Sequence, residues 1–394
     1  MLMPQSYDFL LNFVVMISVK KYKILFVGDP SNFHQSLACG LRKLGHSVTV
    51  ASDGCGWLRT RCDVDLSRPF NNKIGGLLLW LKFKWLMLRK FRGFDIVSVN
   101  GVCPMKLRPN RLASAFDSLR RHNRHIFMSF LGADPFFVEA CQDPNFLRYS
   151  EWLIDGKPGP LALVRPDELR KWLSPPLRQF CGKVYNESEG VVAALYEYWK
   201  SARLTLPSER VGYGGIPIDT DAIEFEPLPE DITKVRFFLG RHRERQLIKG
   251  TDRFEKVLRR LVDTYPDKAE MIIVENKPYD EYLALLRSAH VVMDQMYSYT
   301  PATNALLAMA MGKVAVSGGE PEFYEFINEF DNRPIINAMP DDDALFDQLR
   351  QLALHPERLH QLSIQSRKFV EKHNALDVVA GRFLDFWTSK INEA

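Results

Sequence analysis

The stretch "YKILFVGDPSNFHQSLACGLRKLGHSVTVASDG", from Tyr22 to Gly54, carries the pattern that decides the fold class. Its first eight residues are an apolar run that ends in a turn, which predicts a buried strand. Three leucines follow at helical spacing: Leu37, Leu41 and Leu44. Gly45 ends that helix, and "HSVTVAS" predicts a second strand. A strand, a helix and a strand in this order are typical of a parallel sheet covered on both faces.

The same alternation continues through the first half of the chain. The next predicted strands are Asp95–Asn100, His125–Phe130 and Lys183–Asn186, and Val191–Ala202 is a predicted helix. Gly and Pro then cluster between Pro207 and Pro229, which is typical of a linker between domains. The alternation indicates a doubly wound α/β domain before the linker.

Strands and helices alternate again after the linker, from "KVRFFLG" to "KVAVSGG", and three amphipathic helical segments follow Asp341. We therefore predict an α/β chain with two Rossmann-like domains facing a cleft and a helical C-terminal tail. The predicted parts are an N-terminal extension (1–15), an N-terminal domain (16–206), a C-terminal domain (207–375) and a last helix (376–394) that packs back on the N-terminal domain. The extension is expected because "ISVKKYKILFVGD" after Met16 resembles a natural start.

Composition narrows the class of protein. The chain has 394 residues, 46% hydrophobic and 25% charged, which is ordinary for a globular protein. A net charge of +4 is too weak to indicate nucleic-acid binding. The six cysteines lack metal-ligand spacing, so we expect free thiols and no metal. The apolar run Phe9–Val19 is too short to span a bilayer, and we expect a cytoplasmic protein.

The segment Gly75–Phe94, "GGLLLWLKFKWLMLRKFRGF", is apolar with basic residues interleaved. One interpretation is a core helix with a basic exposed edge. The other is a peripheral contact with an anionic membrane surface. The sequence alone leaves both interpretations open.

The segment "YSYTPATNALLAMAMG" predicts a helix whose start is suited to binding an anion. Thr300 is a suitable N-cap, Pro301 suits the first helical position, and Asn304 lies in the first turn. An exposed helix N-terminus presents free N–H groups and a partial positive charge. The alternative is a well-capped core helix without a ligand.

A glycine-rich acidic loop follows the next predicted strand. Gly318 and Gly319 permit the close approach of a ligand to the backbone, and Glu320 or Glu322 would accept hydrogen bonds from sugar hydroxyls. The alternative is a tight turn between a strand and a helix.

A basic loop runs from Phe238 to Asp252 at the end of a predicted strand. It holds four cations: Arg241, Arg243, Arg245 and Lys249. Four unpaired cations in a loop that faces a cleft would suit a diphosphate, through charge-assisted hydrogen bonds. A solvated basic loop is the alternative.

These motifs, taken in order, resemble GT-B glycosyltransferases of the retaining family 4 type. The matching pieces are Gly240-Arg241, Lys249-Gly250, "AHVVMDQ", "LLAMAMG" and "GGEPE", together with the first strand–helix–strand unit and the crossover "GGIPID". The resemblance implies transfer of a sugar, of the hexosyl type, from a nucleotide-sugar donor to an acceptor hydroxyl. It also implies retention of configuration without a metal or a cofactor. The acceptor would be a glycan or a lipid-linked glycan in surface polysaccharide or glycolipid biosynthesis.

The resemblance also implies roles for individual residues. Lys249 would stabilise the leaving diphosphate together with an arginine, for which Arg245 is the preferred candidate and Arg241 the second. The expected donor-binding residues are Gly28, Arg243, Tyr299, Thr300, Asn304, Gly318, Gly319, Glu320 and Glu322. Asn32 and Asp134 are acceptor-side candidates. In an inverting enzyme Asp29, His34 or Asp134 would be the base.

Two positions depart from the family pattern. The family has glutamates eight positions apart around the donor helix, where this chain has Tyr299 and Leu307. Either Tyr299, Thr300 and Asn304 or the acidic loop would take over the polar contacts to the donor. A catalytically inactive nucleotide-sugar-binding protein and a nucleotide-sugar epimerase with the same fold therefore stay as alternatives.

Overall fold

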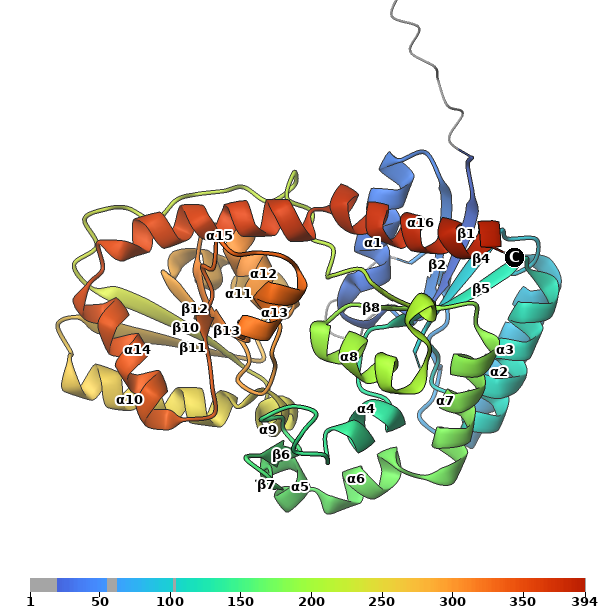
Figure 1. The fold of residues 1–394 in the computed structure, drawn as a ribbon, viewed down its shortest axis with the longest axis horizontal. Helices are drawn as coiled ribbons and strands as arrows, with labels where there is room; N and C mark the ends of the chain where they lie inside the picture. Colours follow the sequence, from blue (N-terminus) through green and yellow to red (C-terminus); the bar gives the residue numbers. More distant parts are fainter. Residues whose placement is uncertain (1–19, 55–61, 102–103, 394) are drawn as a thin grey trace, which may run out of the picture.

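The structure is a computed structural model that describes residues 20–54, 62–101 and 104–393. The predicted extension over 1–15 lies outside the described residues, and so do Cys55 and Cys103. The described chain forms two α/β domains that lie side by side (Figure 1). Each domain is built around its own parallel sheet, as the alternation of strands and helices predicts.

The N-terminal sheet has seven strands in the order β3-β2-β1-β4-β5-β8-β9, and all neighbours are parallel. The strands are β1 (Lys23–Val27), β2 (Ser47–Ser52), β3 (Val64–Asp65), β4 (Ile96–Asn100), β5 (His125–Phe130), β8 (Val191–Ala193) and β9 (Val211–Tyr213). β9 lies within the segment expected to be the linker, so the N-terminal sheet extends to Tyr213. Four of the five residues of β1 are buried, as expected for a strand covered on both faces.

The helices of the N-terminal domain cover both faces of this sheet. They are α1 (Phe33–Lys43), α2 (Lys73–Arg89), α3 (Pro109–His122), α4 (Pro135–Ala140), α5 (Pro160–Val164), α6 (Pro166–Trp172), α7 (Pro175–Glu187) and α8 (Tyr196–Thr205). A short antiparallel pair, β6 (Leu153–Ile154) and β7 (Lys157–Pro158), lies between α4 and α5.

Two of the predicted elements are wrong. Lys183–Asn186 is not a strand but part of α7, whose buried residues recur at helical spacing: Phe180, Cys181, Val184 and Tyr185. Val191–Ala202 is not one helix, because its first three residues form β8 between β5 and β9. The β-branched pair Val191 and Val192 suits that fully buried strand, and the helix begins only at Tyr196.

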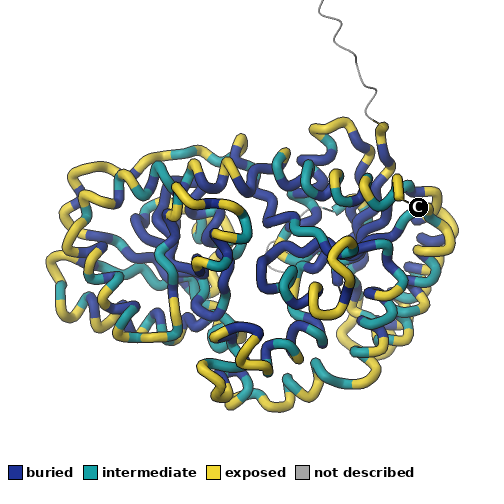
Figure 2. The backbone as a smooth tube through the Cα atoms, in the orientation of Figure 1, coloured by how far each residue is buried: buried dark blue, intermediate teal, exposed yellow. Residues whose placement is uncertain are grey.

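The C-terminal sheet has five parallel strands in the order β11-β10-β12-β13-β14. The strands are β10 (Val235–Arg241), β11 (Ala269–Glu275), β12 (Val291–Met293), β13 (Val314–Ser317) and β14 (Ile336–Asn337). The helices are α9 (Gln246–Lys249), α10 (Thr251–Thr264), α11 (Tyr279–Ser288), α12 (Thr303–Ala310), α13 (Pro321–Phe326), α14 (Asp342–Leu354) and α15 (Arg358–Asn374). Figure 2 shows central strands of both sheets, such as β1, β12 and β13, among the most buried parts of the chain.

The last helix, α16 (Leu376–Glu393), returns to the N-terminal domain after an extended residue, Ala375 (Figure 1). Trp387 of α16 is fully buried, with its ring 6.1 Å from that of Phe26 in β1. A Cβ on Gly214 would lie 2.1 Å from the ring of Phe383, so the crossover needs glycine there. α15 and α16 therefore tie the two domains together along one side.

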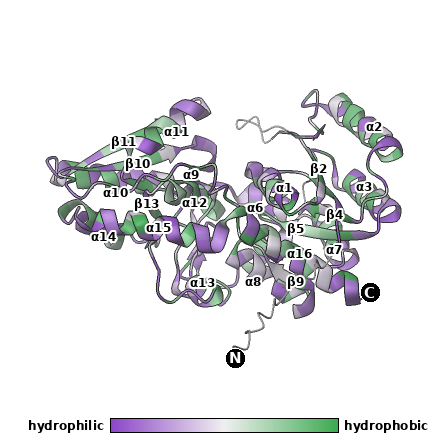
Figure 3. Cartoon of the chain, turned by 90° about the horizontal axis from the view of Figure 1, so that it is seen from above, coloured by the Kyte–Doolittle hydropathy of each residue, from purple (hydrophilic) through white to green (hydrophobic). Residues whose placement is uncertain are grey.

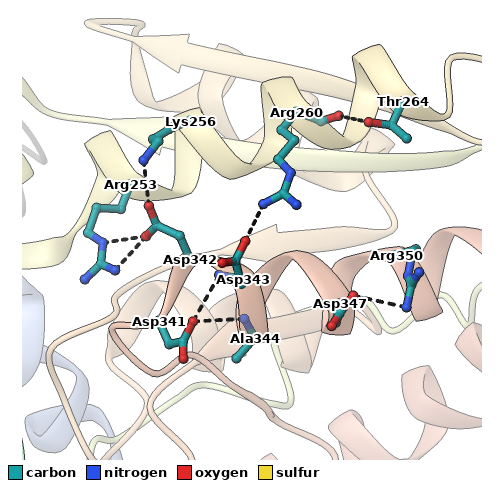
Figure 4. Close-up of polar contacts among 10 residues, drawn as sticks. All are labelled: Arg253, Lys256, Arg260, Thr264, Asp341, Asp342, Asp343, Ala344, Asp347 and Arg350. Atoms are coloured by element: carbon teal, nitrogen blue, oxygen red, sulfur yellow. Dashed lines mark hydrogen bonds and ion pairs between the residues drawn. The ribbon is translucent and has the colours of Figure 1, made fainter.

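Ion pairs join α10 to α14 on the surface of the C-terminal domain (Figure 4). Arg253 and Lys256 both contact Asp342, at 2.6 and 2.9 Å. Asp341 caps α14 by accepting hydrogen bonds from the backbone N–H groups of residues 343 and 344, both at 3.0 Å. These contacts hold the outer layer of the domain and lie outside the strand ends that form the candidate site.

Candidate functional site

The carboxyl ends of β10, β12 and β13 meet at one edge of the C-terminal sheet, because neighbouring strands are parallel. Asp294 directly follows β12 and is buried. Lys249 Nζ donates to Asp294 Oδ1 at 2.9 Å, and Ser317 Oγ donates to Asp294 Oδ2 at 3.3 Å. A cation and a buried carboxylate thus lie where doubly wound sheets bind their ligands.

The backbone fixes the position of Lys249. Its carbonyl accepts from Met296 N at 2.9 Å, and α9 ends at Gly250, which has a φ of 72°. A Cβ on Gly250 would lie 2.8 Å from Met296 Cβ, so glycine is required both by the backbone conformation and by the space. A quarter of the Lys249 side chain stays exposed.

Two more polar side chains complete this group. Asn304, in the first turn of α12, accepts from Tyr282 Oη at 2.7 Å. Burial first, and then the negative charge of Asp294, raise the pKa of Tyr282, so its hydroxyl stays protonated. We call Lys249, Tyr282, Asp294 and Asn304 the edge cluster.

Arg241 and Arg243 are already paired with acids of the same domain. Arg241 contacts Glu255 and Glu275, both at 2.5 Å, and Arg243 contacts Glu275 at 2.5 Å. The expectation of four unpaired cations in this loop is therefore wrong, since Lys249 is also paired. The acids that neutralise the two arginines come from α10 and from the end of β11, the strand beside β10.

Arg245 differs from the other cations of the loop. It is exposed, and the described parts of the chain provide it with no ion pair. Its charge acts on Glu151 of the N-terminal domain. Burial raises the pKa of Glu151 to about 7, the negative charge of Glu197 adds to this rise, and the positive charge of Arg245 opposes it. Arg245 therefore lies near the acids of the opposite domain.

The acidic loop after β13 is bound to the N-terminal domain. The Arg148 guanidinium pairs with the carboxylates of Glu320 and Glu322. Tyr149 Oη donates to Glu320 Oε1 at 2.5 Å, and Asn337 Nδ2 donates to the same oxygen at 2.8 Å. We call Arg148, Tyr149, Glu320 and Glu322 the interdomain latch. Glu320 and Glu322, which were expected to bind a donor, instead contact the N-terminal domain in this structure.

Tyr299 and Thr300 also contact the N-terminal domain. Tyr299 Oη accepts from Arg148 N at 2.8 Å, and Thr300 Oγ1 donates to Glu197 Oε2 at 2.6 Å. Thr300 is not the N-cap of α12, because the helix begins at Thr303 with Ala302 in the capping position. The expectation of a Thr300 cap with Pro301 inside the helix is therefore wrong.

Other parts of the C-terminal domain pack closely against Gly318 and Gly319. A Cβ on Gly318 would lie 2.2 Å from the carbonyl oxygen of Ser298, and one on Gly319 would lie 2.9 Å from Ile335 Cγ2. The backbone segment 298–300 and the Ile335 side chain thus fill the space that was expected to admit a ligand.

The N-terminal candidates fall into two groups, and the first lies at the carboxyl end of β1. Gly28 has a φ of 83°, and a Cβ there would lie 2.8 Å from Pro104 Cα. Burial raises the pKa of Asp29 to about 7. The backbone N–H of His34, which donates to Asp29 Oδ1 at 2.7 Å, opposes this rise. Asn32 follows in a left-handed conformation, with a φ of 63°.

The second group lies in the core. His34 is fully buried, contacts the Gly28 carbonyl and Ser129 Oγ through its two ring nitrogens, and has a pKa lowered to about 4 by burial. Asp134 is also fully buried and caps α4, accepting from Phe137 N and Tyr185 Oη, both at 2.7 Å. The structure gives both residues packing and capping contacts instead of a surface open to an acceptor.

Comparison with known proteins shows similarity in structure only, since no family model and no curated protein sequence matches the chain. Sucrose-phosphate synthase from Thermosynechococcus elongatus superposes with a TM-score of 0.59 at 13% identity, covering 95% of this chain and 100% of that one. Anabaena HepE, solved with UDP-glucose, gives a TM-score of 0.56 at 11% identity, covering 93% and 100%. A Listeria monocytogenes protein that carries the name of a UDP-N-acetylglucosamine 2-epimerase gives 0.54 at 12% identity, covering 95% and 98%.

The chain has the GT-B fold. The carboxyl edges of its two sheets face each other. A contact between the segment that follows β8 and the loop that follows β12 shows this arrangement. Tyr196 N, just after β8, donates to Thr300 Oγ1 at 3.1 Å. The edge cluster and Asp29 both follow strands at these facing edges.

Sequence reasoning missed several residues of this GT-B site. Asp294 could have been found, because it directly follows the apolar run "HVVM". Arg148 and Tyr149 carry no recognisable signal, since they lie in an irregular segment and their partner Glu320 is more than 170 residues away. Glu151 lies in the same irregular segment. The described residues hold no group of three or more His, Cys, Asp or Glu side chains arranged for a metal ion.

Proposed function

We propose that this GT-B chain is a glycosyltransferase that moves a sugar from a nucleotide-sugar donor to an acceptor hydroxyl. The observation that carries the proposal is the position of Lys249 at the carboxyl edge of the C-terminal sheet, with the exposed Arg245 four residues away. The comparison with HepE, which was solved with UDP-glucose, supports a nucleotide sugar as the donor.

The diphosphate of the donor would bind between these cations and the start of α12. Ala302 at the N-cap makes no side-chain hydrogen bond, so the first N–H groups of α12 lack the usual cap. Such groups and the partial positive charge of the helix N-terminus bind phosphate oxygens well. Asn304 is the one predicted donor contact that lies in the edge cluster, and its amide would replace the glutamate that the family has nearby.

In the transfer step the bond between the sugar anomeric carbon and the diphosphate oxygen breaks, and a bond to the acceptor oxygen forms. The leaving diphosphate gains negative charge, which Lys249 and Arg245 would stabilise more strongly than they stabilise the ground state. We propose retention of configuration without a metal, in which the leaving phosphate oxygen takes the acceptor proton.

The acceptor would approach from the N-terminal domain, past Asp29 and Asn32 at the end of β1. We propose a glycan or a lipid-linked glycan as the acceptor, in the assembly of a surface polysaccharide or glycolipid. Burial raises the pKa of Asp29 and that of Glu151 to about 7, so either carboxyl group could exchange a proton near neutral pH.

A panel of nucleotide sugars tests the proposal. Binding and slow donor hydrolysis are measured for the native chain and for Arg245→Ala, Lys249→Ala and Lys256→Ala. Lys256 is the matched control, because it is a lysine of the same domain that pairs with Asp342 outside the site. One nucleotide should be selected, and hydrolysis should fall about 100-fold or more in Lys249→Ala but not in Lys256→Ala. Equal hydrolysis by all variants would contradict the proposal.

An epimerase is the second candidate, favoured by the similarity to the Listeria protein. An epimerase would convert the donor into an isomeric nucleotide sugar without any acceptor, whereas a transferase would release the nucleoside diphosphate. Product analysis by chromatography separates the two reactions. Donor binding with neither product, in the presence of an acceptor extract, would favour an inactive binding protein.

A further inference from the structure

Helix α2 carries large apolar residues on its outer face as well as on its inner face. The inner side packs on the N-terminal domain through buried residues such as Leu79, Phe83 and Leu86. The outer side leaves six large apolar residues between 43% and 69% exposed: Ile74, Leu77, Leu78, Leu81, Trp85 and Leu88. Figure 3 shows α2 at the rim of the N-terminal domain, away from the C-terminal domain.

These six residues form one stripe, because they recur every three or four positions along the helix. A surface helix of a globular protein normally turns charged residues outward. On α10, Lys256 and Arg260 stay exposed even though they pair with Asp342 and Asp343 of α14 (Figure 4). Single exposed leucines need no explanation, but a stripe along a whole helix marks an interaction surface.

The charges around the stripe are mainly positive, although Lys82 pairs with Asp65 at 2.6 Å. Between Asp65 and Asp95 the chain has no acidic residue and seven basic ones: Arg68, Lys73, Lys82, Lys84, Arg89, Lys90 and Arg92. Lys84 lies within the stripe, three residues after Leu81 and four before Leu88. The end of α3 adds Arg121 beside the end of α2, where Gly93 N donates to the His122 carbonyl at 3.0 Å.

We propose that α2 lies in the plane of an anionic lipid membrane, with this stripe in the interfacial region and the basic residues at the headgroups. The cations within and around the stripe favour a membrane over a protein partner, because lysine is depleted in the cores of protein interfaces. At a membrane the lysine stems lie along the apolar surface while the ammonium groups reach the phosphates. The described residues include no helix long and apolar enough to cross a bilayer.

Docking through α2 would also orient the proposed site. α2 follows β3, so its first residues lie near the carboxyl edge of the N-terminal sheet, the edge that holds Asp29. A lipid-linked acceptor in the same membrane would then approach that edge. This consequence rests on the proposed function, whereas the docking does not, so vesicle binding and sugar transfer can fail separately.

Co-sedimentation of the full chain with vesicles tests the docking. One set of vesicles is pure phosphatidylcholine, and the other contains about one-third phosphatidylglycerol. The native chain should bind the anionic vesicles and lose that binding in high salt. Leu81→Ser with Leu88→Ser should reduce the partition coefficient by about tenfold or more. Lys84→Ser with Lys90→Ser should reduce it by a similar factor on anionic vesicles.

The control is Leu204→Ser with Leu354→Ser, two leucines that are exposed on other helices. This variant should bind like the native chain. Circular dichroism and light scattering on every variant exclude unfolding and report the oligomeric state. Equal vesicle binding by the stripe variants and the control would overturn the proposal. A native dimer that becomes a monomer in the stripe variants, without vesicle binding, would also overturn it in favour of a second copy of the chain as the partner.

Discussion

Removal of Arg148 should weaken the contact between the two domains. In Arg148→Ala the carboxylates of Glu320 and Glu322 lose the cation that joins them to the N-terminal domain. The backbone N–H of residue 148, which donates to Tyr299 Oη, stays in place. The variant thus deletes the side-chain part of the latch while leaving the loop connected through its backbone.

The expected loss in the free energy of unfolding follows from how deeply each partner of Arg148 is buried. Glu320 is only 2% exposed and keeps Tyr149 and Asn337, so the loss of one charge-assisted bond there should cost about 1.5–3 kcal/mol. Glu322 is 35% exposed and can be rehydrated, which makes its pair worth less than about 1 kcal/mol. Arg148 is itself half exposed, so water screens both pairs. We expect a net loss of about 2 kcal/mol in the free energy of unfolding.

Urea unfolding measures this loss, with Arg178→Ala as the matched control. Arg148 lies over the ring of Tyr299 as well as pairing with the two glutamates. Arg178 makes the same kinds of contact within the N-terminal domain, an ion pair of 2.6 Å with Glu139 and a position over the ring of Phe136, but both charged groups are exposed. That variant should lose less than about 1 kcal/mol. Equal losses in the two variants would refute the reasoning that Glu320 makes the latch strong.

Three further predictions concern stability. Burial raises the pKa of Glu329, but His373 and other donors more than offset this and lower it to about 2, from 4.5. Stability from this group is therefore present above pH 4.5 and lost as the pH falls toward 2, by up to about 3 kcal/mol. Unfolding at both pH values measures the total loss, and Glu329→Gln should reduce that loss by about this amount, while other paired carboxylates keep their share. Gly318→Ala should destabilise the chain by about 2–3 kcal/mol in urea, because its Cβ would lie 2.2 Å from Ser298 O; an unchanged midpoint would mean that the loop moves freely. Asp341→Ala removes the α14 cap and should lower the melting temperature by an amount equivalent to about 1 kcal/mol, whereas Asp341→Asn should not.

Periodicity predicted the two-sheet fold well, because a buried parallel strand is a local signal. The run that contains β1 and the segment "HVVM" before Asp294 are nearly continuous apolar stretches bounded by polar residues. The prediction was wrong for short segments whose apolar residues fit the spacing of both a strand and a helix. Lys183–Asn186 has strand-like composition, yet its valine and tyrosine lie on the buried face of the amphipathic α7.

The candidate site was less predictable, because pairing between distant residues has no local signal. Arg241 and Glu275 are a partial exception, since both end neighbouring strands and lie opposite each other in the register. The latch joins Arg148 to residues more than 170 positions away, and only the packing of the two domains brings them together. The roles expected for Lys249, Arg245 and Asn304 stay predictions, now with a defined geometry.

The most direct test of the account is calorimetric binding of a nucleoside diphosphate and of its monophosphate to the native chain, Arg245→Ala and Lys256→Ala. Arg245 is exposed, so its removal should leave the fold intact, and it would remove the proposed contact to the second phosphate. We expect the native chain and Lys256→Ala to prefer the diphosphate, and Arg245→Ala to reduce this preference by about tenfold. The same preference in all three proteins would contradict the assignment of this edge as the diphosphate site.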